Sequence, residues 1–597
     1  MPLVAVVARL LSAVAGALAL LGIAAAAGFA AAPDVIRTGG PSAPADSKVA
    51  VVATRAGVAG KAFSVVDARG HVVLRGRLEP ARGSALPWRH AATADLSKVA
   101  RKGTYRVRAA GMTSRTWRVD GRAHGALVRR LLRIFDVNAD GSEPNPVFGP
   151  AHLHDAIAAD GPRAGQRIDL TGGWRDAGDQ LKFASTTAFA VSLLEYAARL
   201  DPPNAAALRR RADVGVRWLL KAHPAPGEFY VLVGDARDHT TGFRDPATDD
   251  ANATPGVGIR YAYTSVSTSV LGEVAGALAL VAARSEGALK DLLVAAAKDW
   301  FAQAVATNRL IVPGGPLVED FYPDPDIGDD LAFAAAGLYR ATGDVAYAAA
   351  AGAALAAGSD DQYYSGVTVG TVAPLVAADL CGGFGAPPAA DEPARRTGCE
   401  GIRKVAGAAR ERMAETAFAT PGIVTFGWVQ DNSGAGAVAA AAQRAGVDPA
   451  GRKVADAARD YLLGRNPYGA SFVVGPASFE AHDPHHPAYL KGSARTLLDG
   501  AVVGGIARRD SIEGQHLKLA PGPARRFDSD RVVYEDRRAD YVTSEVGLSY
   551  SAATILLVAG GAAALAPRST LAGHATRKGH TARRTAAARR DDGRAPR

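Results

Sequence analysis

Residues 172–183 read Gly-Gly-Trp-Arg-Asp-Ala-Gly-Asp-Gln-Leu-Lys-Phe and lead directly into an apolar helical pattern over 181–200. Asp176 and Asp179 therefore stand where a loop meets a helix. Glycines allow a ligand to approach the backbone closely, and a helix start that presents carboxylates can orient a water molecule. An isolated Asp-x-x-Asp at a helix start is more often a cap. Trp174 favours a sugar site instead, because an aromatic ring beside paired acids suits a sugar face.

The helical pattern that begins here continues almost to the end of the chain. Further helical stretches are expected at 205–222 and near 266–284, 289–306, 328–342, 344–358, 366–380, 400–418, 433–445, 450–463 and 549–566. With no strand-rich region among them, they predict one large all-α domain of antiparallel helix pairs over residues 123–566. Many of these stretches are rich in alanine, so we expect the helix axes to approach closely.

The residues before this domain have a different pattern. Short runs with β propensity, separated by turn signals, fill residues 47–122 and predict a small β-sandwich. Residues 33–46 are rich in Pro, Gly and Ser, and we interpret them as a linker.

The two ends of the chain indicate an exported protein with a basic tail. Residues 1–32 combine Arg9, an apolar run and small residues before Pro33, which is typical of a signal peptide. The run is also long enough to be an uncleaved membrane anchor. We expect a protein that is secreted or associated with the cell surface. Residues 567–597 are predicted to be a disordered basic tail.

The positive charge is concentrated outside the large domain. Residues 47–120 contain 15 Lys+Arg and 4 Asp+Glu, and residues 567–597 contain 9 and 2, giving +11 and +7. Residues 1–46 are balanced, so residues 121–566 carry 10 − 11 − 7 = −8. An acidic main domain fits a nucleic-acid phosphate backbone poorly, so no nucleic-acid partner is expected.

Only two cysteines are present, Cys381 and Cys399. In an exported chain we expect them to form a disulfide around a loop rich in Pro and Gly. They are too few for a thiolate zinc site.

A second concentration of polar residues lies near the C-terminus. Glu545 precedes the last apolar helix, where burial would raise the pKa of its carboxyl as a general acid requires. The alternative is a glutamate favoured there by the helix dipole. His485 and His486 are adjacent and are typical of a metal or substrate site, although neighbouring residues rarely chelate one ion together.

Together these segments resemble glycoside hydrolase family 9, inverting enzymes of the cellulase type, preceded by the immunoglobulin-like domain of one branch. The match runs from about Lys48 to Ala566. Its blocks are the Asp-Ala-Gly-Asp motif, Leu220–Pro224, Val233–Asp235 with Asp238-His239, Phe321–Pro323, Leu338–Asp344, Leu462–Pro467, and Asp540-Tyr541 with Glu545. The resemblance implies an (α/α)6 barrel whose loops form an open cleft.

The resemblance also implies roles for individual residues. Asp179 is the expected general base, Asp176 helps it to hold the attacking water, and Glu545 is the expected general acid. Inversion needs two carboxyl groups about 6.5–9.5 Å apart, so that a water molecule fits beside the anomeric carbon. The residues expected to line or support the sugar subsites are Trp174, His485, His486, Asp540 and Tyr541.

Three features depart from the family pattern. Pro487 follows the histidine pair where the family commonly has Arg, and Ser544 precedes the acid where the family usually has Asn. Only six tryptophans are present, which is sparse for a long cellulose-binding cleft.

The substrate therefore stays open among related alternatives. The first is endo-acting hydrolysis of β-1,4-glucan, and the second is an exo-acting β-glucosidase or β-glucosaminidase. For an amino sugar, the acidic residues available would be Asp324, Asp326, Asp329 and Asp330. A third alternative is a non-catalytic polysaccharide-binding protein, disfavoured because all three acids are present.

The remaining expectations concern cofactors and partners. No nucleotide-binding motif is present and no organic cofactor is required. The resemblance allows a structural calcium ion, without placing its ligands. We expect a monomer, with association to the cell envelope left open.

Overall fold

The computed structural model describes residues 31–308, 321, 322, 324 and 326–563. The expected signal peptide or anchor and the expected basic tail lie almost entirely outside these residues. In the described part of the chain, no helix is both long enough and apolar enough to cross a membrane.

The N-terminal part is a β-sandwich of two sheets. One sheet has the order β1-β2-β6-β5, and the other has β4-β3-β7-β8 with β9 also paired to β7. The strands are β1 (Val35–Arg37), β2 (Val49–Thr54), β3 (Ala62–Asp67), β4 (Val72–Arg77), β5 (Glu79–Pro80), β6 (His90–Asp95), β7 (Gly103–Ala109), β8 (Met112–Thr113) and β9 (Trp117–Val119). Alternate residues of these strands, including Val52, Val65, Val107 and Trp117, form a core of their own.

The expected linker over residues 33–46 is wrong in part. Val35–Arg37 forms β1 and pairs with β2 in antiparallel register. The carboxylate of Asp46 is buried and contacts His124 Nε2 at 3.0 Å and Arg459 Nη1 at 3.1 Å. The Pro and Gly content of residues 33–46 suggested a linker. Instead, pairing with β2 attaches this segment to the sandwich, and the ion pairs of Asp46 attach it to the helical domain.

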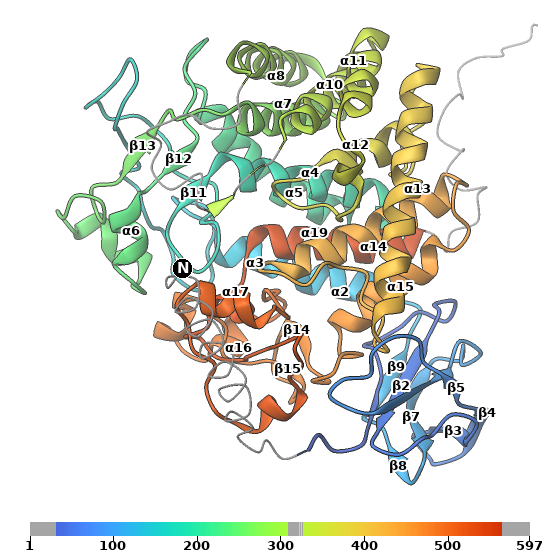
Figure 1. Cartoon of the computed structure of the whole chain (residues 1–597). Helices are drawn as coiled ribbons and strands as arrows, with labels where there is room; N and C mark the ends of the chain where they lie inside the picture. Colours follow the sequence, from blue (N-terminus) through green and yellow to red (C-terminus); the bar gives the residue numbers. More distant parts are fainter. Residues whose placement is uncertain (1–30, 309–320, 323, 325, 564–597) are drawn as a thin grey trace, which may run out of the picture.

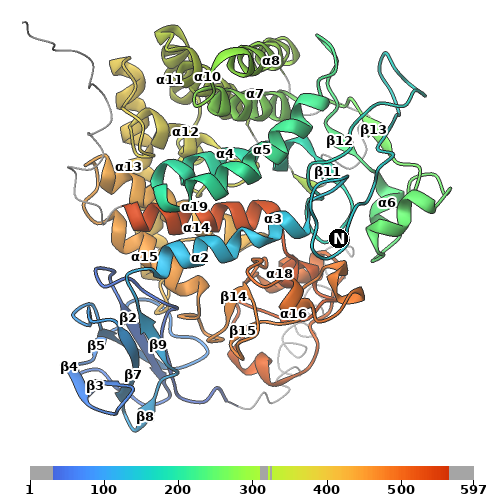
Figure 2. The same ribbon diagram turned by 180° about the vertical axis from the view of Figure 1, so that it is seen from behind.

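The large domain is a double ring of helices, which Figures 1 and 2 show from the side. The inner helices are α4 (Ala184–Leu200), α7 (Thr268–Ala282), α10 (Gly328–Thr342), α12 (Ala373–Leu380), α14 (Trp428–Arg444) and α19 (Leu548–Ala563). Each contacts the next, and α19 returns to α4, which closes the ring. The outer helices are α5 (Ala205–Lys221), α8 (Gly287–Thr307), α11 (Val345–Ala357), α13 (Glu392–Glu415), α15 (Gly451–Leu462) and α2 (Ala123–Leu131). The expected (α/α)6 barrel behind a β-sandwich is confirmed.

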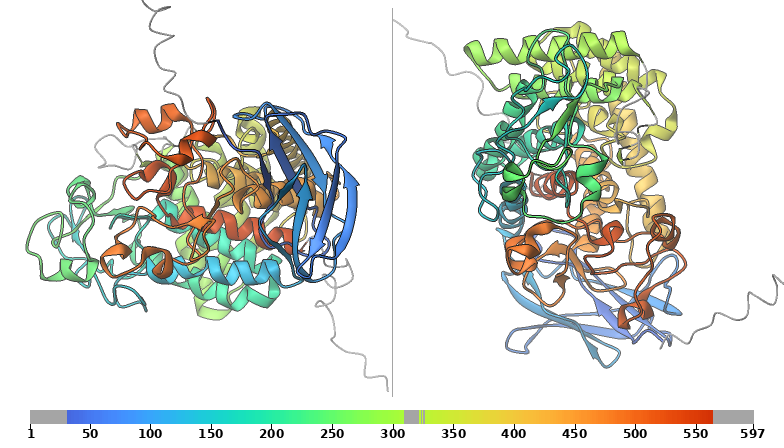
Figure 3. Two further views of the ribbon diagram at one scale, coloured as in Figure 1. Left: turned by 90° about the horizontal axis from the view of Figure 1, so that it is seen from below. Right: turned by 90° about the vertical axis from the view of Figure 1, so that its left-hand side faces the viewer.

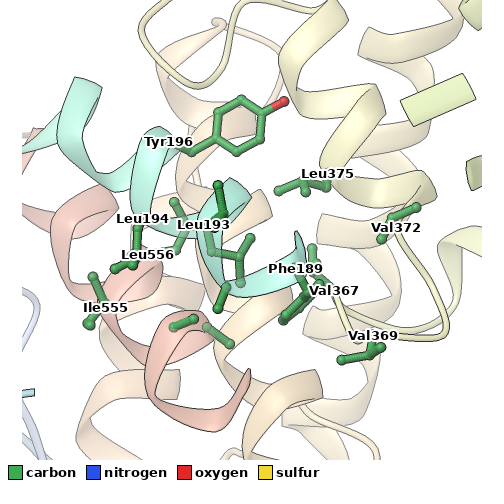
Figure 4. Close-up of a cluster of buried hydrophobic side chains, with 14 of the residues drawn as sticks. Phe189, Leu193, Leu194, Tyr196, Val367, Val369, Val372, Leu375, Ile555 and Leu556 are labelled. Carbon is green, nitrogen blue, oxygen red and sulfur yellow. The ribbon is translucent and has the colours of Figure 1, made fainter. Parts of the chain in front are cut away.

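Small residues let the inner helices pack closely. All residues of α7 are buried, and a Cβ atom on Gly276 would lie 2.5 Å from the Phe333 ring of α10. Figure 4 shows the apolar centre, where Phe189 of α4, Leu375 of α12 and Ile555 of α19 point into one cluster. This core fixes the helix ends from which the loops of the site extend.

Most helix boundaries lie within a few residues of the sequence pattern, but α13 begins at Glu392 rather than near 400, and α14 at Trp428 rather than near 433. The helix expected at 366–380 begins only at Ala373, with Pro374 in its first turn. Cys381, at the end of α12, is bonded to Cys399 in α13, which links an inner helix to an outer one.

Short elements fill the connections that build the site. They are α3 (Arg133–Val137), β10 (Ile157–Ala158), β11 (Lys182–Phe183), β12 (Leu232–Val233), α6 (Ala236–Thr240), β13 (Tyr261–Tyr263), β14 (Ser471–Val474), β15 (Glu480–Ala481), α16 (Ala494–Leu497), α17 (Arg509–Gly514) and α18 (Tyr541–Ser544). The 3₁₀ turns are η1 (Pro202–Asn204), η2 (Pro246–Ala251), η3 (Asp360–Tyr363), η4 (Pro487–Leu490) and η5 (Pro523–Phe527).

Candidate functional site

The loop that carries Asp176 and Asp179 is clamped from both sides. The N–H of Asp176 donates to Leu181 O at 2.9 Å, which closes the loop just before α4. The carbonyl of Asp176 accepts the N–H of Leu548, the first residue of α19, at 3.1 Å. The start of the last helix is therefore docked on the loop that carries the aspartates.

Glu545 lies directly against this loop. It stands between α18 and α19, and its Oε1 accepts the N–H of Gly178 at 3.2 Å. A Cβ atom at position 178 would lie 2.5 Å from His485 O and 3.1 Å from Glu545 Oε1. Only glycine leaves room here, so three segments far apart in the sequence meet at position 178.

The carboxyl groups of Glu545 and Asp176 have raised pKa values. Burial, and then the charges of Asp179 and Asp176, raise the pKa of Glu545 well above its ordinary value. Burial, and then the charge of Asp179, raise the pKa of Asp176 to about 7. Glu545 can therefore hold a proton near neutral pH, as a general acid must.

Two further side chains contact the aspartates, and the sequence analysis assigned them no role. The Tyr322 hydroxyl donates to Asp176 Oδ2. His239 Nδ1 lies 3.1 Å from Asp179 Oδ2, and this hydrogen bond raises the pKa of His239. Tyr322 and His239 lie in two of the sequence blocks that support the family resemblance. Their place in these blocks was the sequence signal that could have identified them as site residues.

Trp174 does not face a sugar site, which corrects the sequence-based expectation. Its side chain is 1% exposed, and its ring meets Phe135 edge to face at 5.2 Å. A Cβ atom on Gly215 of α5 would lie 2.5 Å from the same ring. The segment turns inward at Trp174, so the ring packs between helices.

The two adjacent histidines have different surroundings. His485 is partly buried, donates from Nδ1 to Arg538 O at 2.6 Å and lies 4.5 Å from the Phe243 ring. His486 is 0% exposed; its Nε2 bonds Asn138 Oδ1 at 3.0 Å and its Nδ1 accepts the Ala488 N–H. Successive side chains of an extended segment point to opposite sides. The expectation that His486 contacts substrate is therefore wrong for this conformation, and His485 keeps that assignment as a prediction.

Asp540 and Tyr541 stand at the start of the acid turn. Asp540 is 1% exposed and caps α18 by accepting the N–H groups of Val542 and Thr543, so it holds the turn rather than meeting substrate. Tyr541 is partly exposed, and its ring lies 5.8 Å from that of His485. Asp540 positions the segment before Glu545, and Tyr541 lies beside His485.

The two residues that depart from the family pattern, Pro487 and Ser544, have local structural roles. The Ser544 hydroxyl is buried and bonds to the carbonyls of Arg537 at 2.6 Å and Asp540 at 2.7 Å. Pro487 opens the turn η4. Both residues shape the backbone around Glu545 and His485.

Aromatic residues other than tryptophan form a row beside the segment that carries Glu545. All six tryptophans are buried, each 5% exposed or less. Rings instead follow one another from Phe243 through His485 and Tyr541 to Phe426, with centroids 4.5, 5.8 and 6.2 Å apart. Phe426 is 39% exposed. Among these rings, Tyr541 and Phe426 are partly or largely exposed and could stack on a sugar where tryptophan is absent.

Among the described residues, two groups of side chains have the spacing of a metal site. In the first, Lys182 Nζ lies 3.1 Å from Asp140 and 2.5 Å from Asp155, and His152 bonds Asp140 at 2.9 Å. Arg260 Nε bonds Asp155 at 2.9 Å. These cations of the chain already neutralise the carboxylates, so the first group fits a metal ion poorly.

The second group fits a cation better. Asp324, Asp329 and Asp330 lie together, and Glu273 is close enough for Asp324 and Asp329 to raise its pKa, after burial. Asp329 Oδ1 and Glu273 Oε1 are buried and have no hydrogen-bond partner in the described part of the chain. Asp329 and Asp330 are 3% and 1% exposed, so the expectation that they meet an amino sugar is wrong.

Comparison with known sequences gives the same architecture. The model of glycosyl hydrolase family 9 matches residues 124–558, and that of the cellulase N-terminal ig-like domain matches residues 43–114. Endoglucanase 13 of Arabidopsis thaliana is 32% identical over 233 residues, which are 37% of this chain and 46% of that protein. Endoglucanase 14 of the same plant is 29% identical over 464 residues, 71% of this chain and 90% of that protein. The match to Endoglucanase 13 thus spans about half of that relative.

Solved structures share the fold. A thermostable endoglucanase from Alicyclobacillus acidocaldarius superposes with a TM-score of 0.72 at 22% identity, covering 89% of this chain and 100% of that chain. A metagenome-derived family 9 endoglucanase gives 0.73 at 23% identity, covering 89% and 99%. Since the family model covers most of the sequence, the chain belongs to glycosyl hydrolase family 9.

Proposed function

We propose that the protein is an exported endoglucanase that hydrolyses β-1,4-linked glucan with inversion at the anomeric carbon. The observation that carries the proposal is that Glu545 bonds the N–H of Gly178, in the loop that carries Asp176 and Asp179, and lies close enough to both aspartates for their charges to raise its pKa. Family membership and the endoglucanases among its relatives support the substrate class. The Cys381–Cys399 disulfide supports export, because disulfides persist in oxidising compartments.

In this proposal each carboxyl group has one task. Glu545 donates its proton to the glycosidic oxygen while the bond from that oxygen to the anomeric carbon breaks. A water molecule attacks the same carbon from the opposite face and passes a proton to Asp179. Asp176, held by the Tyr322 hydroxyl, helps to orient the water, and His239 holds Asp179. The products are a shortened chain and a new reducing end.

The role assignment is tested by isosteric variants. Asp179→Asn and Glu545→Gln should each lower the release of reducing sugar from barley β-glucan by about 10²–10⁴-fold, while binding of cello-oligosaccharides is kept. The matched controls, Asp510→Asn and Glu513→Gln, change carboxylates of α17 and should retain activity. Unchanged turnover in either site variant would refute its assigned role.

Product sizes test the mode of attack. An endo-acting enzyme releases a range of oligosaccharides from barley β-glucan, whereas an exo-acting glucosidase or glucosaminidase releases single sugars from chain ends. Cellulose, xyloglucan and chitosan oligomers complete the substrate panel. Single glucosamine units from chitosan, with no cleavage of β-glucan, would replace the proposed substrate with the amino-sugar alternative.

We also propose that Asp324, Asp329, Asp330 and Glu273 hold a calcium ion. Carboxylate oxygens are the ligands that calcium prefers, and the unpartnered oxygens of Asp329 and Glu273 support this assignment. Asp324 follows Tyr322 by two residues. A bound cation would thereby stabilise the segment that brings Tyr322 to Asp176.

A further inference from the structure

One sheet of the N-terminal sandwich has a solvent-facing surface of unusual composition. Strand β3 lies between β4 and β7, with Ser64 paired to Arg75 on one side and to Arg108 on the other. Paired residues in a sheet project to the same face. Val65 and its partners Leu74 and Val107 belong to the sandwich core. Arg75 and Arg108 therefore project away from that core.

The remaining outward positions of this sheet are also rich in arginine. The exposed arginines of β4, β7 and β9 are Arg75, Arg77, Arg106, Arg108 and Arg118, and we call them the arginine face. Alternate residues along a strand are about 7 Å apart, and strands flanking a third are about 10 Å apart. The guanidinium groups thus form a flat array rather than a single cluster.

Few carboxylates are near enough to neutralise the positive charge of the arginine face. Residues 47–120 contain four acids. Asp120 pairs with Arg118, and Asp67 bonds to backbone N–H groups of its own turn. The other two, Glu79 and Asp95, belong to strands of the other sheet. Among the described residues, no ion pair involves Arg75, Arg106 or Arg108.

The array is directed away from the barrel. The sandwich contacts the barrel through other residues: Trp88 packs on Phe418, Ser84 N bonds Glu415 O at 2.8 Å, and Arg115 bonds Leu463 O at 2.6 Å. The other sheet packs on the barrel, because its Val51 and Ala53 belong to the main core, and Figure 3 shows the blue sandwich at the edge of the helical domain. The arginine face is thus free to meet a partner while the catalytic groups meet substrate.

We propose that the arginine face binds an extended polysaccharide that bears carboxylate groups, and so holds the enzyme in a matrix where its neutral substrate lies beside an acidic polymer. Guanidinium groups pair with carboxylates in a planar, two-bonded geometry. A regular array of them matches a polymer with a repeated charge.

Other polyanions fit the same surface less well. The aromatic rings on the strands of this sheet, Phe63, Tyr105 and Trp117, belong to the sandwich core, so none is available to stack nucleic-acid bases. The exposed apolar side chains at this end of the sheet are Val72 and Val73, 41% and 47% exposed. Two valines offer too little apolar surface for insertion into a bilayer.

The test measures binding of the full chain to polygalacturonate by affinity electrophoresis at about 50 mM NaCl, where charge pairing is weakly screened. The variant Arg75→Gln/Arg106→Gln/Arg108→Gln should bind at least about tenfold more weakly than the parent. The control Arg82→Gln/Arg89→Gln/Lys98→Gln removes the same charge from exposed positions outside the face and should lose less than about threefold.

A lysine variant separates geometry from charge. Arg75→Lys/Arg106→Lys/Arg108→Lys keeps the charge but loses the planar donor pair, so its affinity should fall between those of the parent and the glutamine variant. Equal losses in the glutamine variant and its control would overturn the proposal, because net charge alone would then explain binding. So would absence of binding by the parent, or tighter binding to phosphatidylglycerol vesicles or duplex DNA at the same salt.

Catalysis is measured separately, so failure here is distinguishable from failure of the proposed function. The glutamine variant should hydrolyse soluble barley β-glucan at the parent rate, because none of its substitutions lies in the barrel. Loss of that activity would overturn the separation of the two surfaces.

Discussion

Two pairs of carboxyl groups, the buried Asp140 with Asp155 and the buried Asp176 with the partly buried Glu545, differ in what faces them. Lys182 Nζ lies between the first pair. Burial alone would raise the pKa of Asp140, but the charges of His152 and Lys182 overcome it and hold that pKa well below its usual value. No lysine or arginine of the described residues forms an ion pair with Asp176 or Glu545, and their pKa values are raised.

The difference shows how one chain keeps some buried acids charged and others protonated. The first pair belongs to a network that holds both ends of the catalytic loop, because Lys182 Nζ bonds Leu170 O at 2.9 Å and Arg260 bonds Gln180 O at 2.8 Å. The second pair stays without cations, and this lets Glu545 carry a proton. Cations of the chain neutralise the first pair, whereas the raised pKa values favour a proton on the second pair, to which we assign the catalytic roles.

Removing the cation from the first pair should have the largest effect. Lys182→Met leaves Asp140 and Asp155 buried without their lysine and should lower the free energy of unfolding by about 3–5 kcal/mol. The measurement is urea denaturation followed by circular dichroism. Lys221→Met, which removes a partly exposed lysine from Asp169, is the control and should cost about 1 kcal/mol or less. Equal effects would contradict the contrast between the two pairs.

A side chain at position 178 should disturb the second pair directly. Gly178→Ala places a methyl group against His485 O and Glu545 Oε1. We expect kcat on β-glucan to fall about 10²-fold, since displacing a catalytic group by an ångström has that effect, together with a loss of about 1–3 kcal/mol of stability from overpacking. Gly514→Ala, where nothing lies within 4 Å of the added atom, is the control. Parent-like kcat for Gly178→Ala would show that the close approach is unimportant.

The charge of Asp176 should contribute to the upper pH limit of activity, after burial and the charge of Asp179. Glu545 must be protonated to act, so activity is present below its pKa and lost as pH rises through it. Asp176→Asn removes a charge that raises the Glu545 pKa. In that variant the residual kcat/KM should therefore lose its alkaline limb at a lower pH than the parent does. An unmoved or upward-shifted limb would contradict the assignment of Glu545 as the acid.

Binding of calcium should have the smallest of these effects, a modest rise in thermal stability. Adding calcium to chelator-treated protein should raise Tm by a few degrees, because a ligand that binds only the folded state stabilises it. Asp329→Asn should weaken this response, whereas Asp360→Asn, which changes an exposed acid of η3, should preserve it. A response that Asp329→Asn leaves intact would place the ion elsewhere.

The sequence predicted the parts of the fold that depend on periodic burial. Inner helices such as α7 and α19 followed from long apolar patterns, and Glu545 from its place before the last one. Strand β1 was missed because three residues show no alternation that distinguishes them from a linker. The burial of Trp174 and His486 was also missed, since residue type alone does not reveal which way a side chain points in a loop.

The contacts of His239 and Tyr322 depend on the tertiary fold. They reach Asp179 and Asp176 from 60 and 146 residues away in the chain. No local sequence pattern specifies such pairings, because the packing of the barrel helices determines which loops lie together at one end.

Proton NMR of the first sugar released from a β-linked cello-oligosaccharide tests the central claim most directly. If Glu545 protonates the departing oxygen while Asp179 activates water on the opposite face, the new reducing end appears first as the α-anomer and converts to β only by mutarotation. Initial appearance of the β-anomer would mean a retaining reaction, and these carboxyl groups would then need different roles.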